Sequence, residues 1–270
     1  MKDTDEEVHE EDLWFRKYGF FNSPFSIKPG QFDNKIFGQD KLLESLFYQL
    51  PAGTMNFIEG PLGTGKTSVL HHLITKYRGQ KRVIFFSCNR IDQDLNIEEL
   101  LRGRYGFWGR LFGMMPKDMI VLLDEVQDLT PVNTERIKYF FDQGNIKSVV
   151  FTATNYREVN LHQSIKERIG TNLFKVRELS EEEAVDLVRN RVGELELISD
   201  ELIKKVFILS DCNPRRMLQN LDRLCKEATE KHEKEIKIED VRKLGLEAPK
   251  LPISPSRFPL KKRTINRSRL

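Results

Sequence analysis

The chain has 270 residues, of which 39% are hydrophobic and 31% are charged, and its formal net charge is +3. This length and balance fit one large domain with a smaller one beside it. No apolar stretch reaches the roughly 20 residues that span a bilayer, and the acidic start is unlike a signal peptide, so we expect a cytoplasmic protein without membrane insertion. The three cysteines, Cys88, Cys212 and Cys225, have no C-x-x-C spacing and indicate neither a disulfide framework nor a zinc site.

An acidic stretch opens the chain and aromatic residues follow it. Residues 1–12 carry seven acidic side chains and one lysine, which predicts a disordered start. Residues 13–15 and 18–21 then supply an aromatic arm, and we treat residues 1–34 as one N-terminal segment. Residues 37–40 lead into a helix whose apolar face is formed by Leu42, Leu43, Leu46 and Phe47.

Residues 60–67 form a glycine-rich loop of the Gly-x-x-x-x-Gly-Lys-Thr type, between a short apolar run and a helical pattern. Glycines let successive backbone N–H groups point at phosphates, and the helix N-terminus adds its positive end. Lys66 can reach the β- and γ-phosphates, and the Thr67 hydroxyl can ligate Mg²⁺. The candidate nucleotide-binding residues are Gly60, Pro61, Gly63, Thr64, Gly65, Lys66, Thr67 and Ser68.

A later apolar run ends in two carboxylates. Residues 119–123 are continuously apolar, as in a central strand of a parallel sheet that is covered on both faces. Asp124 and Glu125 follow at the carboxyl end, where open α/β sheets bind ligands. Asp124 would hold Mg²⁺ through water and Glu125 would act as general base on the attacking water. The alternative is a strand that simply ends in solvent, which the phosphate loop in the same chain disfavours.

The chain first alternates strands with helices and then becomes helical. Strands are expected at 55–59, 82–87, 119–123, 147–152 and 173–177, which predicts an α/β domain over residues 35–178 with a five-stranded parallel sheet and helices on both faces. From Ser180, which forms a capping box with Glu183, helices are expected at 180–192, 199–209, 214–228 and 238–244. They predict a small all-helical lid over residues 179–246. Residues 247–270 contain several prolines and lack periodicity, so we expect a disordered tail.

This order of motifs resembles the AAA+ ATPases over about residues 35–246. Within that superfamily the chain resembles the initiator-type branch, which includes archaeal origin-recognition ATPases and the related ATPases of DNA transposition and ExeA-type secretion. Residues 18–25 and 37–39 are similar to the latter group, and residues 146–155 are similar to the initiators. The resemblance implies a P-loop AAA+ fold, ATP and Mg²⁺ as cofactors, and slow hydrolysis of ATP that assembly or DNA stimulates.

The resemblance also implies roles for polar residues outside the two motifs. Asn155 matches the sensor 1 residue, which orients the lytic water, although an asparagine there can also belong to an ordinary turn. Arg168 matches the arginine finger of a neighbouring subunit's site, with Lys166 as its competitor, so the chain would form a ring or spiral of identical subunits in which Arg168 acts in trans.

Two further matches place residues around the nucleotide. Arg215 matches the lid arginine that contacts the γ-phosphate, with Arg216 as the alternative. Phe37 and Gly38 match the segment that closes over adenine, although an aromatic residue there can also be part of the core.

Two basic segments are candidates for DNA contact. Residues 100–112 mix arginine with aromatic residues, which suits contact with nucleic acid, and the candidates are Arg102, Arg104 and Arg110. An amphipathic segment that packs on the sheet is the alternative. The tail has seven Lys/Arg and no acid from Ala248 onward, with Lys261, Lys262 and Arg263 as candidates. It could contact phosphates, dock on an acidic protein partner, or only solubilise the chain.

Two functions of different classes remain open. The first is an ATP-dependent, DNA-associated switch in replication initiation, helicase loading or transposition-type regulation. The second is an ATP-binding adaptor of a secretion or other protein complex without a nucleic-acid role. A nucleotide-locked structural subunit is a third, but a pure binder does not need a base at Glu125. Archaeal initiators usually carry a winged-helix domain after the lid and this chain is too short for one, so we do not expect sequence-specific origin recognition.

Overall fold

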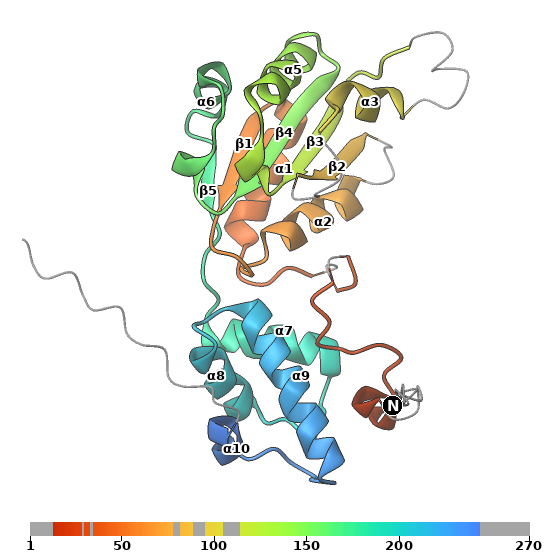
Figure 1. Cartoon of the computed structure of the whole chain (residues 1–270), viewed down its shortest axis with the longest axis vertical. Helices are drawn as coiled ribbons and strands as arrows, with labels where there is room; N and C mark the ends of the chain where they lie inside the picture. Colours follow the sequence, from red (N-terminus) through yellow and green to blue (C-terminus); the bar gives the residue numbers. More distant parts are fainter. Residues whose placement is uncertain are drawn as a thin grey trace, which may run out of the picture.

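The computed structural model describes residues 13–28, 30–32, 35–77, 82–88, 95–104 and 114–243. These residues form an α/β domain and a helical domain, which follow one another along the long axis of the molecule (Figure 1). Within the described ranges we find no helix with the length and apolar character needed to cross a bilayer.

The first domain is built on one parallel sheet with the strand order β2-β3-β4-β1-β5. The strands are β1 (Met55–Glu59), β2 (Val83–Ser87), β3 (Met119–Asp124), β4 (Ile146–Ala153) and β5 (Leu173–Lys175). All five expected strands are confirmed, with bounds that agree to within two residues. β4 lies at the centre, hydrogen-bonded to β3 on one side and to β1 on the other.

Helices cover both faces of this sheet (Figure 1). α1 (Asp40–Ala52) and α2 (Lys66–Tyr77) pack on one face, and α3 (Ile97–Arg102), α5 (Pro131–Asp142) and α6 (Gln163–Ile169) pack on the other. Two short 3₁₀ helices, η4 (Val126–Asp128) and η5 (Tyr156–Glu158), follow β3 and β4. This arrangement confirms the predicted α/β fold.

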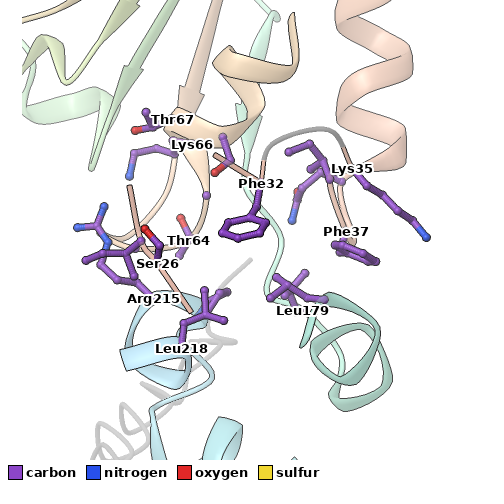
Figure 2. A pocket seen from close by; sticks show the side chains of 18 of the residues that line it. Ser26, Phe32, Lys35, Phe37, Thr64, Lys66, Thr67, Leu179, Arg215 and Leu218 are labelled. Carbon is purple, nitrogen blue, oxygen red and sulfur yellow. The ribbon is translucent and has the colours of Figure 1, made fainter. Parts of the chain in front are cut away.

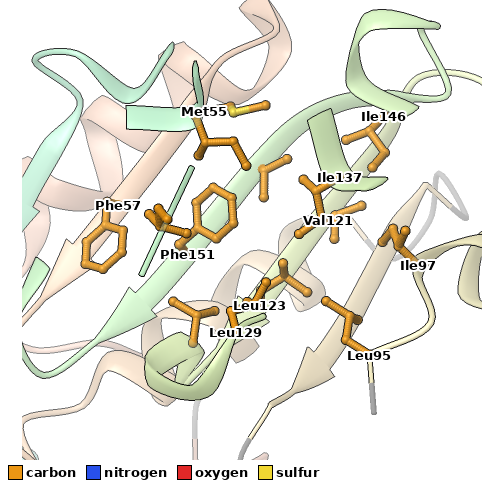
Figure 3. Packing of buried hydrophobic residues seen from close by; sticks show 14 of the residues in the cluster. Met55, Phe57, Leu95, Ile97, Val121, Leu123, Leu129, Ile137, Ile146 and Phe151 are labelled. Carbon is orange, nitrogen blue, oxygen red and sulfur yellow. The ribbon is translucent and has the colours of Figure 1, made fainter. Parts of the chain in front are cut away.

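Burial on both faces explains the apolar character of the central strands. All six residues of β3 are buried. Figure 3 shows the cluster on the α3 and α5 side, where Phe57, Val121 and Phe151 of three neighbouring strands pack with Ile97 and Ile137 of the helices. A strand in this position has no solvent-facing side, so its sequence does not alternate.

The second domain is helical, as expected for a lid. It contains α7 (Glu181–Val192), α8 (Asp200–Leu209), α9 (Pro214–Glu230) and α10 (Ile238–Lys243). The expected capping box is present: the Ser180 hydroxyl accepts the N–H of Glu183 at 3.2 Å, and the Glu183 carboxylate accepts the N–H of Ser180 at 2.8 Å.

The aromatic arm packs against the lid. Trp14 and Phe25 lie in the lid's core with their ring centroids 5.7 Å apart. The Trp14 indole N–H and the Ser23 hydroxyl both donate to Asp222 Oδ1 on α9, at 3.1 and 2.8 Å. The arm's 3₁₀ helix, η2 (Trp14–Tyr18), accordingly lies beside α9 in Figure 1. The arm thus completes the core of a domain that lies far along the chain, since Trp14 and Asp222 are 208 residues apart in the sequence.

Asp222→Ala removes the acceptor that Trp14 and Ser23 share. We expect the free energy of unfolding to fall by about 1–3 kcal/mol, because two partly buried donors lose a charged partner. Urea unfolding followed by Trp14 fluorescence, in a Trp108→Phe background, measures this loss.

Glu227→Ala on the same helix is the matched control. It removes an exposed ion pair with Lys231 and should change stability by less than about 0.5 kcal/mol. Equal losses in the two variants would show that Asp222 does not hold the arm.

Candidate functional site

A cleft of about 1070 Å³, measured to its open mouth, lies between the lid and the carboxyl ends of the strands. The phosphate loop, the N-terminal segment and the lid all contribute to its wall (Figure 2). The main side chains are Thr64, Lys66 and Thr67 of the loop, Phe32 of the N-terminal segment, Phe37 just before α1, and Leu179, Arg215 and Leu218 of the lid.

The loop at residues 60–67 has the backbone that its glycines predict. Gly63 and Gly65 have φ values of +82° and +98°, a region that side chains disfavour. A Cβ atom at Gly65 would meet no other atom within 4 Å, so the backbone there borders open space. α2 begins directly afterwards, which directs its N-terminus at the cleft.

Lys66 is a nearly buried cation, with 6% of its surface exposed. Its ammonium group donates to the carbonyl oxygens of Gly60 and Pro61 at 2.6 and 2.9 Å. Burial lowers the pKa of Lys66 below its ordinary value; Asp124 and Glu125 act against this, and Arg215 adds to it. An anionic ligand in the cleft would stabilise the charged form that burial penalises.

The two carboxylates at the end of β3, Asp124 and Glu125, lie beside the loop. The Thr67 hydroxyl donates to Asp124 Oδ2 at 2.7 Å, which joins α2 to β3. The other oxygen of Asp124 accepts a hydrogen bond from the hydroxyl of Thr152 on β4, and Thr152 Oγ1 accepts the N–H of Glu125 at 3.1 Å. Thr152 was not predicted as a site residue, because a threonine within an apolar run carries no signal of its own.

Glu125 has a backbone conformation that non-glycine residues rarely adopt. Its φ and ψ are 54° and 55°, in the left-handed region, at a cost of about 1–3 kcal/mol. The residue lines the cleft, while the next residue, Val126, is fully buried in the core. The structure therefore holds this strain at the position where the sequence predicts the general base.

Cys88 is the residue next to these carboxylates on the side of β2. Its N–H donates to the carbonyl oxygen of Asp124 at 2.8 Å. Burial, followed by the negative charges of Asp124, Asp128 and Glu125, raises its pKa to about 12. The thiol is therefore neutral and has no nucleophilic role at neutral pH.

The lid contacts the phosphate loop through the start of α9. The Asn213 side chain donates to the carbonyl oxygen of Leu62 at 2.8 Å. A Cβ atom at Gly63 would lie 2.6 Å from Asn213 Oδ1 and 2.9 Å from Arg215 Cβ, so the approach requires glycine. Arg215 lines the cleft, whereas Arg216 pairs with Asp211. Of the two candidate lid arginines, the structure brings Arg215 to the loop.

The segment expected to cover adenine lies at the opposite end of the cleft. Phe37 lines it, and Gly38 has a φ of +68° with no room for a side chain against Leu179. Gln39 fastens the segment to the strand-to-lid connection: its side-chain amide donates to the carbonyl of Arg177 at 2.7 Å and accepts the N–H of Arg177 at 3.1 Å.

Phe32 and Arg191 extend this end of the cleft and were not among the expected site residues. The Arg191 guanidinium lies 4.6 Å from the centroid of the Phe32 ring. It also donates to the carbonyls of Pro24 and Ser26, at 3.2 and 2.9 Å. α7 therefore holds the N-terminal segment where that segment borders the cleft. The pairing joins residues far apart in the sequence, so no local pattern could have indicated it.

Asn155 and Arg168 do not line the cleft. Asn155 follows β4, where its amide donates to Glu158 at 2.8 Å and its Oδ1 accepts the N–H of Arg157, capping η5. Arg168 on α6 pairs with both carboxylate oxygens of Asp142, at 2.8 and 3.1 Å. A finger that serves a neighbouring subunit is expected outside its own subunit's cleft. Lys166, its competitor, is half-buried.

The candidate DNA contacts are only partly described. Arg102 pairs with Glu98 one helical turn away, at 2.8 Å, and Arg104 donates to the carbonyl of Val83. Both arginines are exposed. Arg110 and the tail over residues 247–270, with Lys261, Lys262 and Arg263, lie outside the described residues.

The residues of the cleft fit ATP and Mg²⁺. Open space over the glycine backbone, next to a buried ammonium group, suits phosphate oxygens. Thr67 and Asp124 offer hydroxyl and carboxylate oxygens, the donors that Mg²⁺ prefers. In the part of the chain that the structure describes, no group of three or more His, Cys, Asp or Glu residues is arranged so that it could hold a metal ion. A site with one carboxylate matches Mg²⁺, which takes the rest of its ligands from phosphates and water.

Comparison with known proteins supports this fold. Residues 53–185 match the sequence model of the AAA domain family. No curated protein sequence matches the chain. Similar solved structures include Cdc6p from Pyrobaculum aerophilum, with 18% identity and a TM-score of 0.64 over 82% of this chain and 69% of that one.

Two DNA complexes are similar as well. The ORC1 protein of Aeropyrum pernix in complex with DNA shares 16% identity, with a TM-score of 0.63 over 83% of this chain and 69% of that one. Drosophila ORC bound to DNA shares 16% identity, with a TM-score of 0.61 over 90% of this chain and 68% of that one. The chain therefore has the AAA+ fold of these structures, and its residues 53–185 are similar to the AAA domain family.

Proposed function

We propose that this chain binds ATP with Mg²⁺ in the cleft and hydrolyses it to ADP and phosphate. One observation carries the proposal: Lys66, Thr67, Asp124, Glu125 and Arg215 meet at one end of the cleft although they come from different elements. This set combines a phosphate-binding cation, a pair of oxygen ligands, a candidate base and a second cation from the lid.

Each residue has a distinct role in this proposal. The loop N–H groups and Lys66 bind the β- and γ-phosphates, and Thr67 and Asp124 hold Mg²⁺, which neutralises phosphate charge. Glu125 takes a proton from water as the water oxygen bonds to the γ-phosphorus. The bond from that phosphorus to the β–γ bridging oxygen breaks, and ADP leaves. Arg215 contacts the γ-phosphate from the lid.

Lys66→Ala and Glu125→Gln separate binding from chemistry. We expect Lys66→Ala to lower ATP affinity by more than about tenfold, because the buried cation at the phosphates is lost. Glu125→Gln should keep the affinity and lower kcat by about 100-fold or more, because the general base is lost. Equilibrium binding and phosphate release measure the two effects.

Glu59→Gln is the matched control for Glu125→Gln. Glu59 also ends a strand next to the loop, but its carboxylate pairs with Lys175 at 3.2 Å and does not line the cleft. Its kcat should stay within about twofold of wild type. Wild-type turnover in Glu125→Gln would remove Glu125 from the proposed role of base.

We further propose that the subunits assemble and that Arg168 completes a neighbouring site. The support is its place on α6, away from its own cleft, and its side chain, which is one third exposed. In the single chain its guanidinium is held by Asp142. The finger must exchange this carboxylate for the partner's phosphate when subunits meet.

Mixing two inactive variants tests the arrangement in trans. Arg168→Ala and Glu125→Gln subunits should each be inactive, and their mixture should regain activity because composite sites pair an intact base with an intact finger. Asp142→Ala removes the same ion pair but keeps the finger, so it should retain turnover. An inactive mixture at high protein concentration, or equal loss in Asp142→Ala, would contradict the proposal.

We propose a DNA-associated role for the assembled ATPase. Support comes from the similar ORC structures, which are complexes with DNA, and from the basic tail. Arg102 and Arg104 have partners within the chain, so the tail is the stronger candidate for phosphate contact. The alternative is an adaptor whose tail docks on an acidic protein surface.

Salt-dependent DNA binding separates these two functions. Changing Lys261, Lys262 and Arg263 to Gln should weaken duplex binding at low salt and lower the slope of log affinity against log salt by about one per lost phosphate contact. The control changes Lys226, Lys231 and Lys234 on the exposed surface of the lid to Gln. No DNA binding by wild type at low salt with ATP and Mg²⁺ would favour the adaptor.

A further inference from the structure

Thr152 is a fully buried polar residue at the catalytic end of the sheet. Its exposure is 0%, and it lies on the central strand β4. Phe151 and Ala153, its neighbours along the strand, belong to the cluster under α5 and α6, whereas Val150 belongs to the cluster under α1 and α2. Strand alternation therefore places Thr152 on the side of α2, which carries Thr67.

The hydrogen bonds of Thr152 have only one possible direction. The backbone N–H of Glu125 can only donate, so the hydroxyl oxygen of Thr152 accepts it and the hydroxyl proton is left for the second partner. The hydroxyl of Thr152 must therefore give its proton to Asp124 Oδ1 and receive the N–H of Glu125, at 3.1 Å. Since Thr67 donates to Oδ2, hydroxyls from two different elements hold the Asp124 carboxylate.

The same contact fixes the start of an unusual turn. In a continuing strand, Asp124 and Glu125 would face opposite sides of the sheet. The left-handed backbone of Glu125 interrupts this alternation, so that Glu125 lines the cleft while Asp124 faces Thr67. The hydrogen bond from the Glu125 N–H to Thr152 holds the chain at the residue where it turns.

We propose that Thr152 is the positioning residue for both carboxylates. It orients Asp124 for Mg²⁺ through its donated proton, and it aims Glu125 at the attacking water by fixing the Glu125 backbone. It touches neither ATP nor the metal. This inference rests on the proposed ATPase function and assigns the geometry of that site to a hydroxyl outside the loop and the Asp-Glu pair.

Thr152→Val tests this with little change of shape, because valine keeps the branched side chain that suits a strand and has a methyl group in place of the hydroxyl. We expect kcat to fall by about tenfold or more and the Mg²⁺ concentration for half-maximal rate to rise. Thr152→Ser keeps the hydroxyl and should retain both the rate and the Mg²⁺ dependence.

Ser148→Ala is the control for the loss of a buried hydroxyl on the same strand. Ser148 is also 0% exposed, donates to the carbonyl of Leu50 at 2.7 Å and accepts the N–H of Thr54 at 2.9 Å, away from the carboxylates. Its loss should lower stability as Thr152→Val does, but leave kcat and Mg²⁺ dependence unchanged.

A binding experiment separates this inference from the proposed function. A fluorescent ATP analogue is titrated in Mg²⁺ and in EDTA: wild type should bind more tightly in Mg²⁺, and Thr152→Val should lose most of that gain while matching wild type in EDTA. Wild-type behaviour of Thr152→Val in both experiments, or an equal defect in Thr152→Ser, overturns the inference. Binding without turnover in wild type overturns the proposed hydrolysis and leaves the Mg²⁺ titration to decide the role of Thr152.

Discussion

The approach of the lid to the phosphate loop at Gly63 is the contact on which the geometry of the cleft depends. A side chain at Gly63 would meet Asn213 at 2.6 Å, so the loop admits the start of α9 only as bare backbone. Asn213 has two tasks: it donates to the carbonyl of Leu62, and its Oδ1 caps α9 by accepting the N–H groups of Arg215 and Arg216. One side chain thereby connects the backbone of the loop to the helix that carries the lid arginine.

This contact explains why phosphate binding and lid position are expected to be coupled. Arg215 lies close enough to Lys66 to lower its pKa further, so two cations face the same space. Their repulsion opposes closure, and bound phosphate would relieve it. Loss of the γ-phosphate would restore part of the repulsion, which provides a physical reason for the lid to change its angle after hydrolysis.

The N-terminal arm forms part of the core of the lid. Trp14 and Ser23 bind Asp222, and Arg191 holds the segment that leads into Phe32, so the arm and the lid share one core. The same segment then continues to Gln39, which pairs with the backbone of Arg177. A change of lid angle is therefore expected to move the far end of the cleft together with Arg215.

Short sequence patterns predicted the features whose structure depends mainly on neighbouring residues. The phosphate loop, the Asp124–Glu125 pair, the five strands and the capping box at Ser180 each have a short sequence signature, and the structure contains each of them. The helical lid was predicted because the sequence pattern becomes purely helical from Ser180 onward.

Contacts between distant segments could not be predicted in the same way. Asp222 looks like an ordinary helix residue in the sequence, and only the packing of Trp14 on α9 gives it a role. Thr152 is one of several polar residues of β4, and only the place of Asp124 beside it distinguishes it. Arg215 and Arg216 are equivalent in sequence. Successive helix residues point about 100° apart, so only the placement of α9 on the loop distinguishes them.

Contact between Arg215 of the lid and the γ-phosphate is tested most directly by comparing the binding of ATP with that of ADP. Isothermal titration in a Glu125→Gln background, with Mg²⁺, gives the Kd of each nucleotide. Arg215→Ala should weaken ATP binding by about tenfold or more, because a charge-assisted contact is lost, and leave ADP binding unchanged. Arg216→Ala, which loses the surface pair with Asp211, should bind both nucleotides as the parent does. Equal affinity of Arg215→Ala and its parent for ATP would contradict the account.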